Sequence, residues 1–304
     1  MAPTYATARV QAGPVGISAL VLEGASCGIL RKVSGGAIAA DVVSEAVGPG
    51  HVAKKHLGPL RYEDFELDIG FAMGKPVFDW IAETWQMKYP RRNGSVLACT
   101  EKLEAKGERK FFAALLTETT IPMLDGSAKE PAWIKVRFVP ERIQHVKASG
   151  KASGADPKHP EKLFVPASFK LEIAGLDCSK VHKIEPFTVR QSVAHDGLGE
   201  SRDMAVEPTT VSFPDLKVTF AEVAVDSWLE WFDDFVVKGN CDEGKEKSGK
   251  LTLLSPNQQP LASISLFNLG IFRIGSLDSD AGEDKLKLAR ASLYCERMEF
   301  KLGA

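Results

Sequence analysis

The stretch from Tyr62 to Trp85, YEDFELDIGFAMGKPVFDWIAETW, changes its apolar period half-way along. Apolar and polar residues alternate from Phe65 to Phe71, which predicts a half-buried strand. Beyond this strand, the apolar residues Val77, Ile81 and Trp85 recur four apart and form one face of a short amphipathic helix. The sequence therefore predicts a strand, a tight turn and a helix that ends in tryptophan.

The same pattern returns from Phe213 to Phe235, FPDLKVTFAEVAVDSWLEWFDDF, and Trp231 follows Trp80 by 151 positions. After the helices, four additional residues change this offset to 155. The pairs at 151 are Leu20 with Leu171, Gly24 with Gly175, Cys27 with Cys178, Lys32 with Lys183, Val42 with Val193 and Gly48 with Gly199; those at 155 are Gly94 with Gly249, Phe112 with Phe267 and Glu141-Arg142 with Glu296-Arg297. Two offsets that hold at so many apolar and glycine positions predict an internal duplication.

We expect a mainly β chain of two tandem antiparallel β-barrel or β-sandwich domains, each with one short α-helix, because strands and helices do not alternate as in a doubly wound sheet. The polar stretch from Lys147 to Pro160, KASGKASGADPKHP, has the composition of a linker. The predicted segments are an N-terminal arm 1–16, a first domain 17–146, a linker 147–162 and a second domain 163–304.

The longest predicted elements are two hairpins at matched positions. One joins Ala37–Val47 to His56–Ile69 through a tip at Gly48–Lys55, and the other joins Phe187–His195 to Val206–Phe220 through a tip at Asp196–Asp203. The second helix is expected over Val225–Val237. The other expected strands are Ile17–Glu23, Gly28–Val33, Ser95–Thr100, Lys110–Leu116, Trp133–His145, Phe169–Ile173, Val181–Ile184, Leu251–Leu254, Ile264–Ile271 and Lys287–Lys301.

Composition excludes several classes of protein. The 304 residues carry a net charge of −2, which argues against a dedicated nucleic-acid binder. The halves on either side of Gly150 differ, at +3 and −5, and opposite signs help neighbouring halves to meet. An odd count of five cysteines without a secretory signal is typical of a reducing cytoplasm, and no window is apolar enough to span a membrane. We expect a soluble protein without membrane insertion.

Candidate chemical motifs have simpler explanations. The stretch Gly239–Lys245 has the spacing of a phosphate-binding loop, but Glu246 stands where Ser or Thr would bind magnesium. The stretch Gly48–Ala53 imitates a dinucleotide fingerprint, yet no helix pattern follows it. Six scattered histidines, among them His51 and His56, lack metal-ligand spacing. We therefore predict no catalytic, cofactor-binding or metal-binding residue, and no enzymatic activity.

Each half resembles the tail-tube protein family of contractile phage tails and related contractile injection systems. The matching features are a strand ending in a glycine turn, a Lys-Val-Ser-Gly-like segment, a long hairpin, a helix with tryptophan and a strand that begins at glycine. They lie at Glu23-Gly24 and Ala174-Gly175, at Lys32–Gly35 and weakly Lys183–Glu185, at Leu57–Tyr62 leading into Phe65–Leu67, at Phe78–Trp80 and Leu229–Trp231, and at Gly94 and Gly249. The order and spacing of these features cover nearly the whole chain, twice.

The resemblance implies a structural subunit in which six β domains close into a ring and rings stack into a hollow tube. Because two domains are fused here, three chains would supply the six, as a homotrimer with pseudo-sixfold symmetry. Its partners would be itself and sheath, baseplate or hub proteins, after assembly in the cytoplasm into a phage-tail-like particle. A hub or tube-initiator ring of a contractile injection system is an alternative. A β-rich binding module or hydrolase outside this family also stays open.

Overall fold

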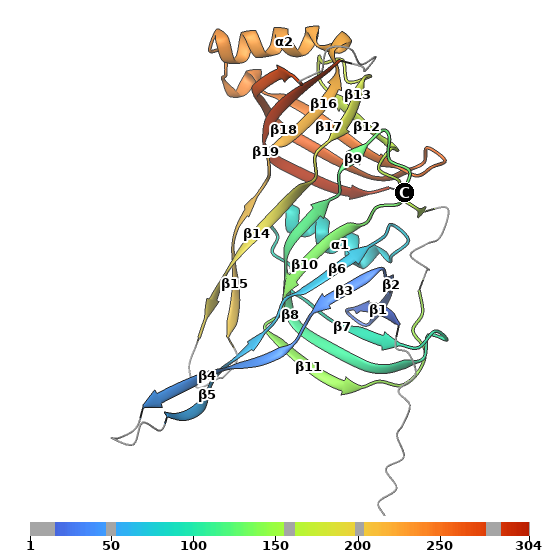
Figure 1. Ribbon diagram of the computed structural model, residues 1–304, viewed down its shortest axis with the longest axis vertical. Helices are drawn as coiled ribbons and strands as arrows, with labels where there is room; N and C mark the ends of the chain where they lie inside the picture. Colours follow the sequence, from blue (N-terminus) through green and yellow to red (C-terminus); the bar gives the residue numbers. More distant parts are fainter. Residues whose placement is uncertain (1–15, 47–52, 155–161, 198–203, 278–286, 304) are drawn as a thin grey trace, which may run out of the picture.

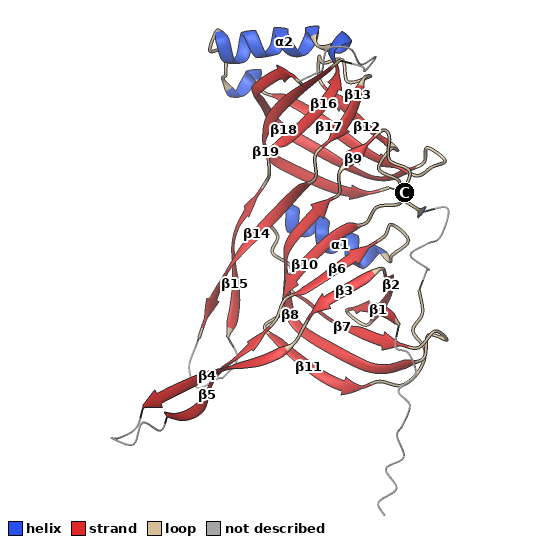
Figure 2. Ribbon diagram, viewed as in Figure 1, coloured by secondary structure: helices blue, strands red, loops and turns tan. Residues whose placement is uncertain are grey.

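Antiparallel sheets make up most of the computed structural model, which describes residues 16–46, 53–154, 162–197, 204–277 and 287–303 (Figures 1 and 2). The expected N-terminal arm 1–16 lies outside the described residues except for Gly16, and so do most of the two hairpin tips. The mainly β fold class predicted from the sequence is confirmed, with antiparallel pairing throughout the described strands.

The first half forms a sheet with the strand order β2-β1-β7-β8-β10-β6-β3, and β11 pairs with β8. The strands are β1 (Ile17–Leu22), β2 (Ala25–Leu30), β3 (Lys32–Gly35), β6 (Phe65–Ile69), β7 (Arg92–Cys99), β8 (Ala105–Ile121), β10 (Ile134–Val139) and β11 (Arg142–Lys147). The projecting hairpin β4 (Ile38–Ala46) and β5 (Ala53–Tyr62) forms a separate two-stranded sheet (Figure 1).

The second half forms a sheet with the order β12-β17-β18-β19-β16-β13, to which the short first-half strand β9 (Leu124–Asp125) is added. Its strands are β12 (Phe169–Ile173), β13 (Val181–Ile184), β16 (Leu216–Ala221), β17 (Lys247–Leu254), β18 (Pro260–Ser276) and β19 (Leu288–Leu302). The hairpin β14 (Phe187–Asp196) and β15 (Ala205–Ser212) leaves this sheet and joins that of the first half.

The two sheets pair their strands in the same registers. Leu20–Val96, Phe65–Phe138 and Arg142–Phe112 in the first half correspond to Leu171–Leu251, Leu216–Leu293 and Arg297–Phe267 in the second. Both hairpins carry a register shift at the same place, between Ala40 and Val42 and between Gln191 and Val193. The offsets of 151 and 155 therefore relate strand pairings as well as residues.

One helix in each half carries the matched tryptophan. Helix α1 (Lys75–Trp85) buries Trp80 at 2% exposure, and α2 (Asp226–Phe232) buries Trp231 at 7%. The second helix, expected over Val225–Val237, is α-helical only to Phe232 and continues as a π-helix over Asp233–Val237.

Three long strands expected from the sequence are broken. The arm His56–Ile69 divides into β5 and β6, and Trp133–His145 divides into β10 and β11 at Pro140, which has no N–H to donate to a ladder. The arm Val206–Phe220 divides into β15 and β16 around Pro214 for the same reason. The first and third breaks let the chain pass between a sheet and a hairpin, whereas β10 and β11 continue along the same edge of β8 on either side of Pro140.

The buried core is continuous across the halves. It includes Phe65 and Trp85 from the first half and Phe220 and Phe300 from the second. Ala152, within the segment predicted to link the domains, is buried against Ala19 beside the first-half sheet. The domain boundaries stay a prediction.

Candidate assembly interface

A β-ladder joins the two halves. Strand β14 pairs with β8, so that Phe187 lies opposite Ile121 and Arg190 opposite Glu118. The other edge of this part of β8 pairs with β10. The hydroxyls of Thr120 and Thr188 share a hydrogen bond of 2.9 Å. The hairpin β14–β15, which follows β13 in the chain, thus extends the first-half sheet.

Helix α1 lies between the two halves, and its apolar side chains contact both of them (Figure 1). Trp80 packs on Phe138 of its own half, with ring centroids 5.3 Å apart. The rings of Phe78 and Trp85 instead contact Phe300 of β19, at 6.2 Å and 5.8 Å. The Phe78 and Trp85 side chains are each 1% exposed. The helix therefore buries one side against the first half and another against the second.

An ionic cluster of Arg91, Glu141 and Glu207 also links the first half to the β14–β15 hairpin. The Arg91 guanidinium contacts the Glu141 carboxylate and lies 3.0 Å from Glu207 Oε2 on β15. The Val206 backbone N–H donates to Glu141 Oε1 at 3.1 Å. Because the three side chains are partly exposed, each pair contributes only about 0–1 kcal/mol to stability. The cluster specifies geometry more than it stabilises the joint.

The edge of β8 that pairs with β14 has a counterpart in the second half of the chain. Residues Arg273–Ser276 of β18 correspond, at the offset of 155, to the stretch Glu118–Ile121 that accepts β14. They pair with β19 on one edge. Within the described part of the chain, no strand pairs with their other edge.

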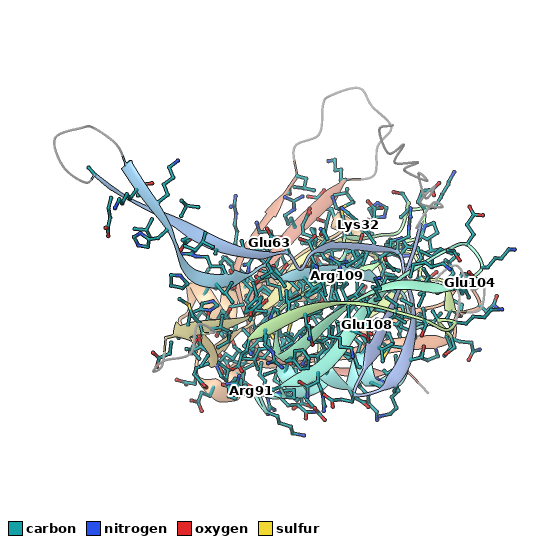
Figure 3. All side chains as sticks on the ribbon, turned by 90° about the horizontal axis from the view of Figure 1, so that it is seen from below. Lys32, Glu63, Arg91, Glu104, Glu108 and Arg109 are labelled. Atoms are coloured by element: carbon teal, nitrogen blue, oxygen red, sulfur yellow. The ribbon has the colours of Figure 1, made fainter. Side chains whose placement is uncertain are left out.

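The donating side also has a counterpart, the hairpin β4–β5, which corresponds to β14–β15. In the described residues, β4 pairs only with β5. Val193 of β14 packs against Leu115 and Val139 of the first half, whereas its counterpart Val42 is 61% exposed. Figure 3 shows the hairpin reaching beyond the body of the first half, with Glu63 near its root.

The two helices also differ in burial at matched positions. Leu229 and Val236 occupy the positions of Phe78 and Trp85, but they are 45% and 41% exposed rather than 1%. The helix lies on the outer end of the second-half sheet (Figure 1). The face that α1 buries between the halves is therefore presented to solvent by α2.

Among the described residues, no three His, Cys, Asp or Glu side chains are placed to hold a metal ion. Burial raises the pKa of the Cys27, Cys178 and Cys295 thiols to about 11, which keeps them protonated near neutral pH. Residues 239–245 form an exposed connection between the second helix and β17.

Most of the fingerprint-like stretch Gly48–Ala53, with His51, lies outside the described residues. No helix in the described part of the chain has the length and apolar character needed to cross a membrane.

Comparison with known proteins gives similarity at the level of solved structures alone. No protein-family model and no curated protein sequence matches the chain. A chain of the anti-feeding prophage baseplate is 16% identical over 44% of this chain and 92% of its own, with a TM-score of 0.37. A chain of the sheath–tube complex of an extracellular contractile injection system, PVC, is 13% identical over 44% and 88%, with a TM-score of 0.34.

Hcp1 from Flavobacterium johnsoniae is 11% identical over 45% of this chain and 96% of its own, with a TM-score of 0.27.

Proposed function

We propose that this protein is a structural subunit that joins copies of itself, end to end, through the contact that joins its own two halves. The observation that carries the proposal is the joint between β14 and β8, for which the chain holds an unfilled copy of each side. The β18 edge at Arg273–Ser276 would accept the β4–β5 hairpin of the next copy, as β8 accepts β14–β15.

The repeated registers support a tandem duplication as the origin of this arrangement. Strand order, pairing register and the hairpin shift recur at the offsets seen in the sequence. Left-handed backbone also recurs, at Ala113 (φ 48°) and Asn268 (φ 54°), which lie 155 apart. Two halves built alike can make the same contact within a chain and between chains.

The corresponding positions give the register of the contact between copies. Thr188–Thr120, Val189–Thr119 and Arg190–Glu118 pair within the chain. Their counterparts are Ala37–Gly275, Ile38–Ile274 and Ala39–Arg273. In this arrangement Leu229 and Val236 of α2 would face β11 of the next copy, because Phe300 corresponds to His145 of that strand.

A contact of this kind is head-to-tail and either closes into a ring or continues without limit. Unpaired strand edges favour aggregation, and closure removes them. The resemblance to tail-tube proteins leads us to a ring of three copies with six similar halves. Such rings would stack into a hollow tube of a phage-tail-like particle, assembled in the cytoplasm and contacting sheath, baseplate or hub proteins.

The test is the mass of the purified full-length chain as its concentration rises, together with negative-stain microscopy. We expect monomers to give way to trimers and their multiples, with six-lobed rings and tubes in the images. Single rings that never stack would favour the hub or tube-initiator role. A stable monomer or a twofold dimer at high concentration, without rings, would overturn the proposal.

A further inference from the structure

The ionic cluster at the joint has its charges exchanged in the unfilled copy. Glu246 takes the position of Arg91, because both precede the corresponding strands β7 and β17 at the offset of 155. His56 takes the position of Glu207, and both strand registers place them alike, opposite Val43 and Ala194. The acidic side chain has therefore moved from the hairpin to the sheet edge, and a histidine that follows two lysines stands on the hairpin instead.

The acceptor side of the unfilled copy is acidic. Glu246 Oε1 accepts a hydrogen bond of 2.7 Å from the Tyr294 hydroxyl, while its Oε2 is buried and, among the described residues, meets no hydrogen-bond donor. Glu296, the counterpart of Glu141, is exposed and accepts from Asn268 at 2.9 Å. Burial and the two carboxylates raise the pKa of Tyr294. We call Glu246 and Glu296, with the exposed Asp242 and Glu243 before them, the acidic face.

The hairpin side of the unfilled copy is basic. Lys54, Lys55 and His56 follow one another on β5, and all three are exposed. Lys55 corresponds to Val206, whose backbone N–H donates to Glu141. The same placement would direct the backbone N–H of Lys55 toward Glu296. We call Lys54–His56 the basic segment.

We propose that the basic segment of one copy binds the acidic face of the next, and that this exchange of charges makes the halves alternate. The inference rests on the proposed function, and its partner is a second copy of this chain. A first-half hairpin on a first-half edge would place the basic segment against Arg91, which already pairs with Glu141 there. A second-half hairpin on a second-half edge would place Glu207 against Glu246 and Glu296.

Both mismatched pairings bring like charges together, which disfavours them during encounter and in the bound state. The matched pairing brings opposite charges together and gives the buried Glu246 oxygen a cationic neighbour. The two kinds of half therefore alternate around a ring. The contact between copies, which relies on exposed charges, is also more sensitive to salt than the aromatic contact within a copy.

The experiment compares full-length variants by sedimentation over a concentration range, in about 0.1 M and about 1 M salt, where the Debye length falls from about 10 Å to about 3 Å. Glu246→Arg should weaken association at low salt by at least about tenfold, and His56→Glu should weaken it by less because both lysines remain. The double variant Glu246→Arg/His56→Glu restores opposite charges and should recover most of the loss.

Glu101→Arg, which makes the same charge change at an exposed turn, is the matched control and should associate like the wild type. Glu246→Gln keeps the shape beside Tyr294 and guards against loss through misfolding, which far-ultraviolet circular dichroism would also reveal. If the wild type assembles while Glu246→Arg and Glu246→Gln associate as well as it does, or the double variant is as weak as Glu246→Arg, this inference is overturned and the proposed function stands. If the wild type stays monomeric, the proposed function itself fails.

Discussion

Truncating the matched positions Phe78 and Leu229 separates the contact within the chain from the contact between chains. Phe78 is 1% exposed and stacks on Phe71 and Phe300, at 5.7 Å and 6.2 Å. Phe78→Ala should therefore lower the free energy of unfolding by roughly 3–5 kcal/mol. Leu229 is 45% exposed, and the buried part of a leucine contributes about 1 kcal/mol. Leu229→Ala should cost the isolated chain about that amount.

The order of effects should reverse in assembly. If the next copy covers Leu229, its remaining exposed surface contributes roughly a further 1 kcal/mol there, or about fivefold in affinity for each contact. The measurements are urea unfolding of dilute protein, followed by circular dichroism, and sedimentation at increasing concentration. The reasoning fails if Leu229→Ala destabilises the dilute chain as much as Phe78→Ala, or if it leaves association unchanged.

Two more predictions follow from burial. Trp80→Ala and Trp231→Ala should each cost roughly 3–5 kcal/mol in urea unfolding, and a loss below about 1 kcal/mol would place that residue outside the core. At about pH 8, iodoacetamide should modify the exposed Cys241 first, because a thiol whose pKa is raised stays protonated, and so unreactive, until the pH approaches that value. Mass spectrometry of the native protein should locate the first adduct there, whereas early modification of Cys27 or Cys295, whose pKa values are about 11, would contradict the described burial.

The sequence alone predicts the repeat and most strands, because the matched positions carry the packing of each half. Gly94 is an example: a Cβ there would lie 2.3 Å from the Val21 carbonyl oxygen, and Gly249 faces Glu172 in the same way at 2.9 Å. Such close approaches need glycine in both halves. The two offsets could therefore be found without any structure.

The joint could not be found in this way. The pattern of Phe187–His195 predicts a strand, but strand pairing depends on neighbours and burial, so nothing local indicates β8 as the partner of β14. Arg91, Glu141 and Glu207 are far apart in the sequence and meet only in the folded chain. Aligning the two halves shows that Glu246 stands at the position of Arg91. The consequence of this difference is clear only once Arg91 is known to contact Glu141 and Glu207.

The central claim, that copies join as the halves do, is tested most directly by a disulfide at the proposed register. In a Cys241→Ser background, the chain would carry Ile38→Cys and Ile274→Cys, which the internal pairing of Val189 with Thr119 places opposite each other between copies. Paired antiparallel residues have Cα atoms about 4.5–5.5 Å apart, within reach of a disulfide. The control carries Ala40→Cys with Ile274→Cys, two residues out of register.

Mild oxidation of the assembled protein, followed by denaturing electrophoresis, should give dimers and then a covalent trimer at which the series stops. The out-of-register control should remain almost entirely monomeric. Monomers from the in-register variant, equal yields from both variants, or a ladder that continues beyond three copies would contradict the account.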